Sequence, residues 1–375
     1  MRKLVPLLCL VILSRAAALF AQGTPETIKV GFVGDPYNYG AFSLANLAGL
    51  EFAAKRVNSA GGLLGQQVEI VVKGDTCGPE TAAGDVAREF LDEGVILVFG
   101  FPCADSARKA LEAFENRALL MSSLVSDPSL SGEGHPYFFR TIPPDDYEAR
   151  LIAGLVKKNA YKKALVVNDG DDRNAALARQ IQGLLAAGGP DAAKTEVLAE
   201  TIAPGAESYD ALAKKLRRPN PDVAIFLGKP ADAAKFALNL KAAKLAPVMV
   251  GPVSLFDDDF PALGGEAVEG SYVVGKDDIL LGPEARAALE DNGSRRAEAT
   301  AIYYVYSVGA AQALFEAIAK ARTPFDLALV KRHLNEDTVL TAMGPTRFDA
   351  NGDIEGGAGH SLHAIQHGKF VIVEP

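Results

Sequence analysis

The chain has 375 residues, of which 49% are hydrophobic and 23% are charged, and its formal net charge is −9. The length predicts about two domains, and the composition is ordinary for a globular protein in water. The negative charge argues against nucleic acid or an anionic membrane as the main partner, because both attract basic surfaces.

The N-terminal segment predicts export. Two basic residues, Arg2 and Lys3, precede an apolar stretch at 4–13 and a group of small alanines. This order is typical of a secretory signal peptide, which we place at residues 1–21. The alternative is a membrane anchor, but the apolar stretch is much shorter than the roughly 20 residues that cross a bilayer. We therefore expect the mature protein to be soluble in the periplasm.

The stretch from Ile28 to Phe101 predicts three strands that alternate with two helices. Three apolar runs have the length of strands: 28–33, 68–72 and 95–99. Between the first two, leucines and alanines at helical spacing predict a helix that ends at Gly61-Gly62. This alternation builds a parallel sheet with helices on its faces, and ligands then bind at the carboxyl ends of the strands. Those ends are three loops: 37–39, 75–79 and 102–105.

Two cysteines, Cys77 and Cys103, remain once the signal peptide with Cys9 is removed. An even number in an oxidising compartment indicates one disulfide. Both residues follow strands of the same predicted sheet, so their loops emerge at the same edge. The alternatives are two buried free thiols or a metal site, for which no histidine or acidic cluster supplies the other ligands.

The alternation restarts after Pro143-Pro144. Four further runs predict strands separated by helices: 163–168, 197–202, 222–228 and 247–251. The second half therefore repeats the first as a similar α/β unit. Toward the C-terminus we expect a long helix at 297–321 and a β-hairpin at 363–373.

Short motifs run in a fixed order along nearly the whole mature chain: Ile28-Lys29-Val30-Gly31, Val57-Asn58-Ser59-Ala60-Gly61-Gly62, the Cys77/Cys103 pair, Asp127-Pro128-Ser129-Leu130, Phe139-Arg140-Thr141, Met343-Gly344-Pro345 and Phe348-Asp349-Ala350-Asn351-Gly352-Asp353. Each is weak alone, but the ordered set is specific. Because it contains this ordered set of motifs, the chain resembles the type I periplasmic substrate-binding proteins of ABC importers, in the group that binds leucine, isoleucine and valine.

The resemblance implies an α/β fold of two Rossmann-like lobes, each a mostly parallel sheet flanked by helices, joined by a three-segment hinge. We expect the crossovers near 141–144, 272–275 and 344–346. The first lobe then comprises 27–141 plus 273–344, and the second comprises 142–272 plus 345–375. A small solute binds between the lobes, closure buries it, and membrane permease subunits recognise the closed form. We expect the protein to be a monomer, to need no cofactor and to leave the solute chemically unchanged.

The resemblance also implies ligand contacts, several of them through backbone groups: Tyr39, Cys103, Ala104, Ser122, Ser123, Ser126, Arg173, Lys229 and Val253. The position of Ala104 is commonly a serine in the family. Two aromatic positions of the second lobe fall at Arg173 and Lys229, and the acid that pairs with the ligand's ammonium falls at Val253.

Compared with the family pattern, these positions carry two additional cations and lack one acid. This favours a carboxylate or other anionic solute, because a guanidinium matches a carboxylate with two parallel hydrogen bonds. Two alternatives stay open. Asp105 or Asp171 replaces the lost acid, which restores an amino acid ligand, or Arg173 and Lys229 are merely solvated residues at the rim.

Other function classes lack their motifs. The sequence has no Gly-x-Ser-x-Gly, His-Glu-x-x-His or Walker glycine loop, so we expect no enzyme. Asp349, Asn351 and Asp353 begin like a calcium loop, but Ile354 stands where that loop needs glycine, so a turn is expected. The remaining alternative is a module of the same fold that senses a ligand for a signalling receptor.

Overall fold

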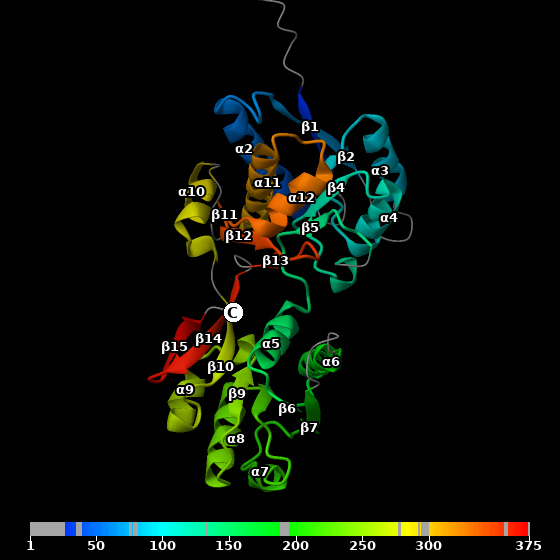
Figure 1. Ribbon diagram of the computed structural model, residues 1–375. Helices are drawn as coiled ribbons and strands as arrows, with labels where there is room; N and C mark the ends of the chain where they lie inside the picture. The colour runs from blue at the N-terminus through cyan, green and yellow to red at the C-terminus, as the bar shows by residue number, and fades with distance from the viewer. Residues whose placement is uncertain are drawn as a thin grey trace, which may run out of the picture.

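The computed structural model describes residues 27–34, 40–74, 77, 82–131, 134–187, 195–276, 279–291, 293, 300–355 and 359–373. The predicted signal peptide and Tyr39 lie outside these residues. The described part of the chain forms two lobes, which Figure 1 shows one above the other.

The first lobe is built on a parallel sheet in the order β2-β1-β3-β4-β5. Its strands are β1 (Ile28–Gly34), β2 (Val68–Gly74), β3 (Leu97–Gly100), β4 (Leu119–Ser122) and β5 (Phe138–Arg140). Every residue of β3 and β4 is buried, because helices cover both faces of the sheet. This explains why these strands read as unbroken apolar runs in the sequence.

The helices that flank this sheet in the described residues are α2 (Gly40–Ser59), α3 (Ala83–Asp92), α4 (Ala104–Phe114), α10 (Pro283–Asp291), α11 (Ala301–Ala321) and α12 (Leu327–Glu336). The long helix α11 is apolar nearly all round because it lies inside the lobe, packed on α2. No helix of the described ranges has both the length and the hydropathy needed to span a bilayer.

The second lobe is built on a sheet in the order β15-β14-β10-β9-β8-β6-β7. Its strands are β6 (Lys163–Asn168), β7 (Glu196–Thr201), β8 (Val223–Leu227), β9 (Val248–Gly251), β10 (Tyr272–Lys276), β14 (His360–Gln366) and β15 (Lys369–Val373). Its helices are α5 (Tyr147–Lys158), α6 (Asp172–Ala186), α7 (Asp210–Lys215), α8 (Pro230–Ala242) and α9 (Asp259–Gly264). The predicted C-terminal hairpin is confirmed, since β14 and β15 pair antiparallel.

Both lobes repeat one strand order. The order β2-β1-β3-β4-β5 of the first lobe corresponds to β7-β6-β8-β9-β10 in the second. In such sheets the direction of winding reverses between two neighbouring strands, here β1/β3 and β6/β8, and ligands bind beyond that point. At the first of these points Gly100 has φ +107°, and a Cβ there would lie 1.9 Å from the Val33 carbonyl oxygen. Only glycine lets the two backbones approach so closely.

Two of the expected lobe boundaries need correction. Residues 272–276 form β10 of the second lobe, whereas Ile279 packs on the core of the first lobe, so the chain does not change lobes at 272–275. A small sheet of β11 (Val339–Thr341), β12 (Gly344–Phe348) and β13 (Ile354–Glu355) belongs to the first lobe. Phe348 packs edge-on against Phe139 of β5, which fixes this segment there. The chain therefore stays in the first lobe through β13, and the third crossover does not lie at 344–346.

Candidate functional site

The carboxyl ends of both sheets lie at the boundary between the lobes. The first crossover leaves the carboxyl end of β5, and the second leaves the carboxyl end of β10. Since the parallel strands of each sheet share one direction, the loops after them face the opposite lobe (Figure 1). This is where the sequence predicts the solute to bind.

In the first lobe the predicted serines follow β4. The Ser122 hydroxyl is buried and accepts the Val125 N–H at 3.2 Å. Ser123 Oγ is also buried and lies 3.1 Å from Thr141 Oγ1, whose hydroxyl donates to the Tyr306 carbonyl. Both hydroxyls thus have partners inside the lobe. The carbonyl oxygen of half-buried Ser126 accepts the Asp145 N–H at the first crossover.

The predicted disulfide is present. It joins Cys77, in the loop after β2, to Cys103, and their Cα atoms are 5.9 Å apart. Cys103 is the N-cap residue of α4 and Ala104 is its first helical residue. The first amides of a helix have no intrahelical acceptor and carry a partial positive charge, which suits a carboxylate. A contact through the backbone at Ala104 therefore needs no serine side chain.

An aromatic group stands beside these loops. The ring centroids of Phe42, in the first turn of α2, and Tyr303, in the first turn of α11, are 4.9 Å apart. Tyr306, one turn further, lies 6.4 Å from Tyr303. Burial raises the pKa of Tyr306 to about 12, so its phenol stays neutral at physiological pH. Phe42 and Tyr303 are half-buried, so part of each ring is open to solvent.

In the second lobe the carboxyl ends of β6, β8 and β9 surround a hollow of about 510 Å³. Its lining includes two carboxylates of the loop after β6, Asp169 and Asp171, and two cations, Arg173 in the first turn of α6 and Lys229 after β8. The hollow lies at the β6/β8 switch point, where this kind of sheet binds ligands. Lys229 precedes the first residue of α8, and its side chain is exposed.

A carboxylate that the sequence did not single out lies behind this hollow. Glu148, in the first turn of α5, accepts the backbone N–H of Val253 through Oε1. Its Oε2 lies 3.3 Å from Nη2 of Arg173. The side chain of Glu148 is only 13% exposed, whereas that of Arg173 is 64% exposed. The Glu148 carboxylate thus joins α5 to the first turn of α6 and to the loop after β9.

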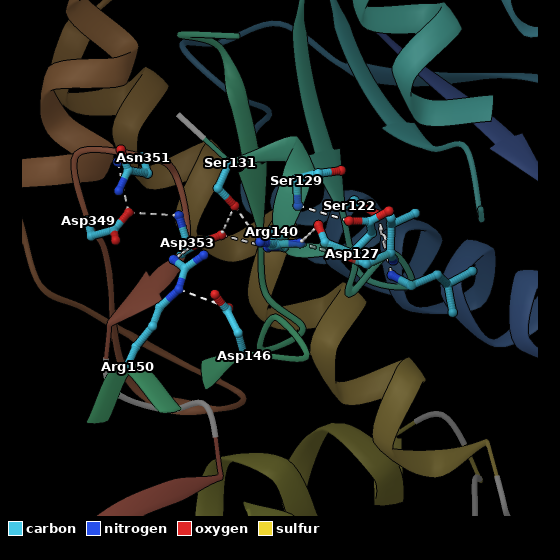
Figure 2. Close-up of polar contacts among 12 residues, drawn as sticks. Ser122, Asp127, Ser129, Ser131, Arg140, Asp146, Arg150, Asp349, Asn351 and Asp353 are labelled. Carbon is cyan, nitrogen blue, oxygen red and sulfur yellow. Dashed lines mark hydrogen bonds and ion pairs between the residues drawn. The ribbon is translucent and has the colours of Figure 1, made fainter. Parts of the chain in front are cut away.

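The hinge contains a buried ion-pair network. The side chains of Arg140, at the end of β5, and Asp353 are 0% and 3% exposed, and Arg140 Nε donates to Asp353 Oδ1 at 2.6 Å. Figure 2 shows Asp353 between this arginine and Arg150. Arg150 belongs to α5 of the second lobe and also pairs with Asp146 at 2.9 Å. The Asp353 carboxylate therefore joins the two lobes at the hinge.

The segment before Asp353 is the expected turn. Asp349 Oδ1 accepts the backbone N–H groups of Asn351 and Asp353 at 2.8 and 2.9 Å. Burial, with the nearby Asp353 charge, raises the pKa of Asp349. Within the described ranges no group of three or more His, Cys, Asp or Glu side chains could hold a metal ion.

The sequence pattern of the family described as periplasmic binding protein matches residues 27–363. The chain belongs to the periplasmic binding protein family. It is 24% identical over 344 residues to the Leu/Ile/Val-binding protein of Escherichia coli K12, covering 91% of this chain and 92% of that relative. It is 26% identical over 329 residues to the Leu/Ile/Val-binding protein BraC3 of Rhizobium johnstonii, with 87% and 88% covered.

The fold of this periplasmic binding protein is that of known type I structures. It superposes on an ABC transporter substrate-binding protein from Desulfitobacterium hafniense with a TM-score of 0.54 and 19% identity, covering 93% of this chain and 100% of that one. The two α/β lobes predicted from the sequence are thereby confirmed.

The structure gathers the predicted contacts into two groups. Arg173 and Lys229 line the hollow of the second lobe, and Val253 is joined to Arg173 through Glu148. In the first lobe the cysteine–alanine pair follows β3, and the three serines lie at the end of β4 and after it. A solute contact at each of them, and at Tyr39, stays a prediction. The sequence did not predict Glu148 because contacts were expected after the strands, whereas Glu148 lies in the helix before β6. Its only signal is an acidic residue in the first turn of that helix.

Proposed function

We propose that this protein is the exported solute-binding component of a branched-chain-amino-acid-type ABC importer, and that it captures a small amino acid or organic carboxylate by closing its hinge. The proposal rests on one observation above all. A hollow lined by two cations and two carboxylates lies at the carboxyl ends of the second lobe's strands, on the side of the first lobe (Figure 1). The relatives named Leu/Ile/Val-binding proteins, matched over nearly their whole length, support the transport role.

Closure follows from differential binding. A solute in the second-lobe hollow touches the first lobe only when the lobes approach, so the closed state binds it more tightly. The solute then shifts the hinge equilibrium by that difference in affinity, and the permease subunits recognise the closed shape. The cation of Arg173 and the helix N-terminus at Ala104 offer two places for a carboxylate, one on each lobe.

A thermal-shift screen tests the proposal. We expect at least one compound among the amino acids and the aliphatic and aromatic carboxylates to raise the midpoint of thermal unfolding, because a ligand of the native state stabilises it by about 2.7 kcal/mol at a hundred times its Kd. Arg173→Ala should weaken that compound by about tenfold, the effect of one charge-assisted hydrogen bond.

The control is Arg179→Ala, which removes an exposed arginine further along the same helix. It should leave the affinity unchanged. A screen in which no compound of any class moves the midpoint refutes the proposed function, and equal affinities for the two arginine variants refute the role of Arg173.

A further inference from the structure

The charges at the proposed solute site differ in the folded chain from those expected from the sequence. Compared with the family pattern, the sequence places two additional cations in the second lobe and has Val253 where the family has an acid. In the folded chain the Glu148 carboxylate accepts the N–H of that same Val253. Together with Asp169 and Asp171 it makes three carboxylates against Arg173 and Lys229, so this half of the site carries a net negative charge. Such a balance does not favour a purely anionic solute.

We propose that Glu148 is the residue that selects solutes bearing an ammonium group, so that it takes the place of the acid absent from position 253. This proposal rests on the proposed solute-binding function and names the solute class as a zwitterion. An ammonium enclosed between the lobes needs a counter-charge, because desolvating it unpaired is unfavourable.

The Glu148 carboxylate has acceptor capacity for such a ligand. A carboxylate offers about four acceptor sites, and the Val253 N–H and Arg173 guanidinium use one each. The Val253 contact is made by a backbone group and fixes the carboxylate in place.

The Arg173 contact is exchangeable. The guanidinium lies 3.3 Å from Glu148 on a side chain that is 64% exposed, and exposed pairs of this kind contribute little to stability. On binding, the solute's ammonium replaces the guanidinium at Glu148, and the freed Arg173 binds the solute's carboxylate. Both charges of the protein pair keep a partner throughout. The sequence suggested that Arg173 and Lys229 select an anion. We propose instead that Arg173 and Glu148 together bind the two charges of a zwitterion.

The test compares solutes that differ only in the ammonium group. Isothermal titration uses L-leucine with 4-methylpentanoate, L-phenylalanine with 3-phenylpropanoate, and L-glutamate with pentanedioate. We expect the wild type to bind at least one of these amino acids about tenfold or more tightly than its des-amino partner. Glu148→Gln should abolish that preference by weakening the amino acid alone, since the glutamine carbonyl still accepts the Val253 N–H. Glu148→Asp should restore part of it.

The matched control is Glu266→Gln, which removes the same charge from an exposed ion pair with Lys241 at the far end of α8. It should leave the preference intact. A hinge or stability effect of Glu148→Gln would weaken both members of a pair equally, because both close the same lobes, and that result overturns the proposal. So does a wild type that binds none of the three amino acids or prefers their des-amino partners. If nothing in the wider screen binds either, the proposed function itself fails.

Discussion

Asp353→Asn is expected to lower the free energy of unfolding by about 3–5 kcal/mol, because it leaves a buried arginine without its counter-charge. The side chain of Arg140 is 0% exposed and donates to Asp353 Oδ1 at 2.6 Å. Its Nη1 also donates to the Asp127 carbonyl at 2.7 Å, so the guanidinium cannot turn toward water without breaking a second contact. Urea unfolding followed by far-UV circular dichroism measures the change.

An exposed ion pair close to Asp353 supplies the control. Arg347 and Glu355 also pair, but their side chains are 46% and 48% exposed. Glu355→Gln removes the same charge two residues from Asp353 and should change the free energy of unfolding by no more than about 1 kcal/mol. Equal losses for Asp353→Asn and Glu355→Gln would show that burial of the Arg140–Asp353 pair is not what matters.

Loss of the disulfide has the second-largest expected effect. The Cys77–Cys103 bond closes a loop with a sequence separation of 26. In the chain-entropy model a loop of this length stabilises the fold by about 3–4 kcal/mol, because the cross-link restricts the unfolded chain. The double variant Cys77→Ser, Cys103→Ser should lose that amount in urea unfolding of the mature protein, without any reductant.

Reduction provides an independent check. Treating the wild type with a reductant should lower its stability to that of the double variant, while the same treatment leaves the variant unchanged. If a thiol assay shows both cysteines reduced and the free energy of unfolding stays the same, the loop is held by its packing, and the cross-link is dispensable.

The fold could be predicted because its signals are local. Apolar runs separated by helical spacing predict parallel sheets wherever they occur, and β3 and β4 confirm this with every residue buried. The cysteine pair was predicted because only two cysteines lie outside the predicted signal peptide and both follow strands of one sheet. The 363–373 hairpin was predicted from two apolar runs joined by His367-Gly368.

The third lobe boundary could not be predicted. The run 344–348 is an adequate strand for either lobe, and its partner decides where it belongs. The deciding partner is Phe139 of β5, which packs on Phe348, whereas β11 pairs with this run but adjoins it in the chain. A contact between residues distant in the chain leaves no period in the sequence, because each strand satisfies its own pattern without reference to the other.

The sequence by itself determined that this protein has two α/β lobes and a disulfide between loops at the strand ends, since the runs and spacings that predict them are local in the chain. The tertiary structure alone decided the charges at those loops. Glu148 meets Val253 across 105 residues, and Arg140 meets Asp353 across 213. The reason is physical: an ion pair depends on where two side chains arrive after folding, and a carboxylate from one helix can replace an acid missing from another loop.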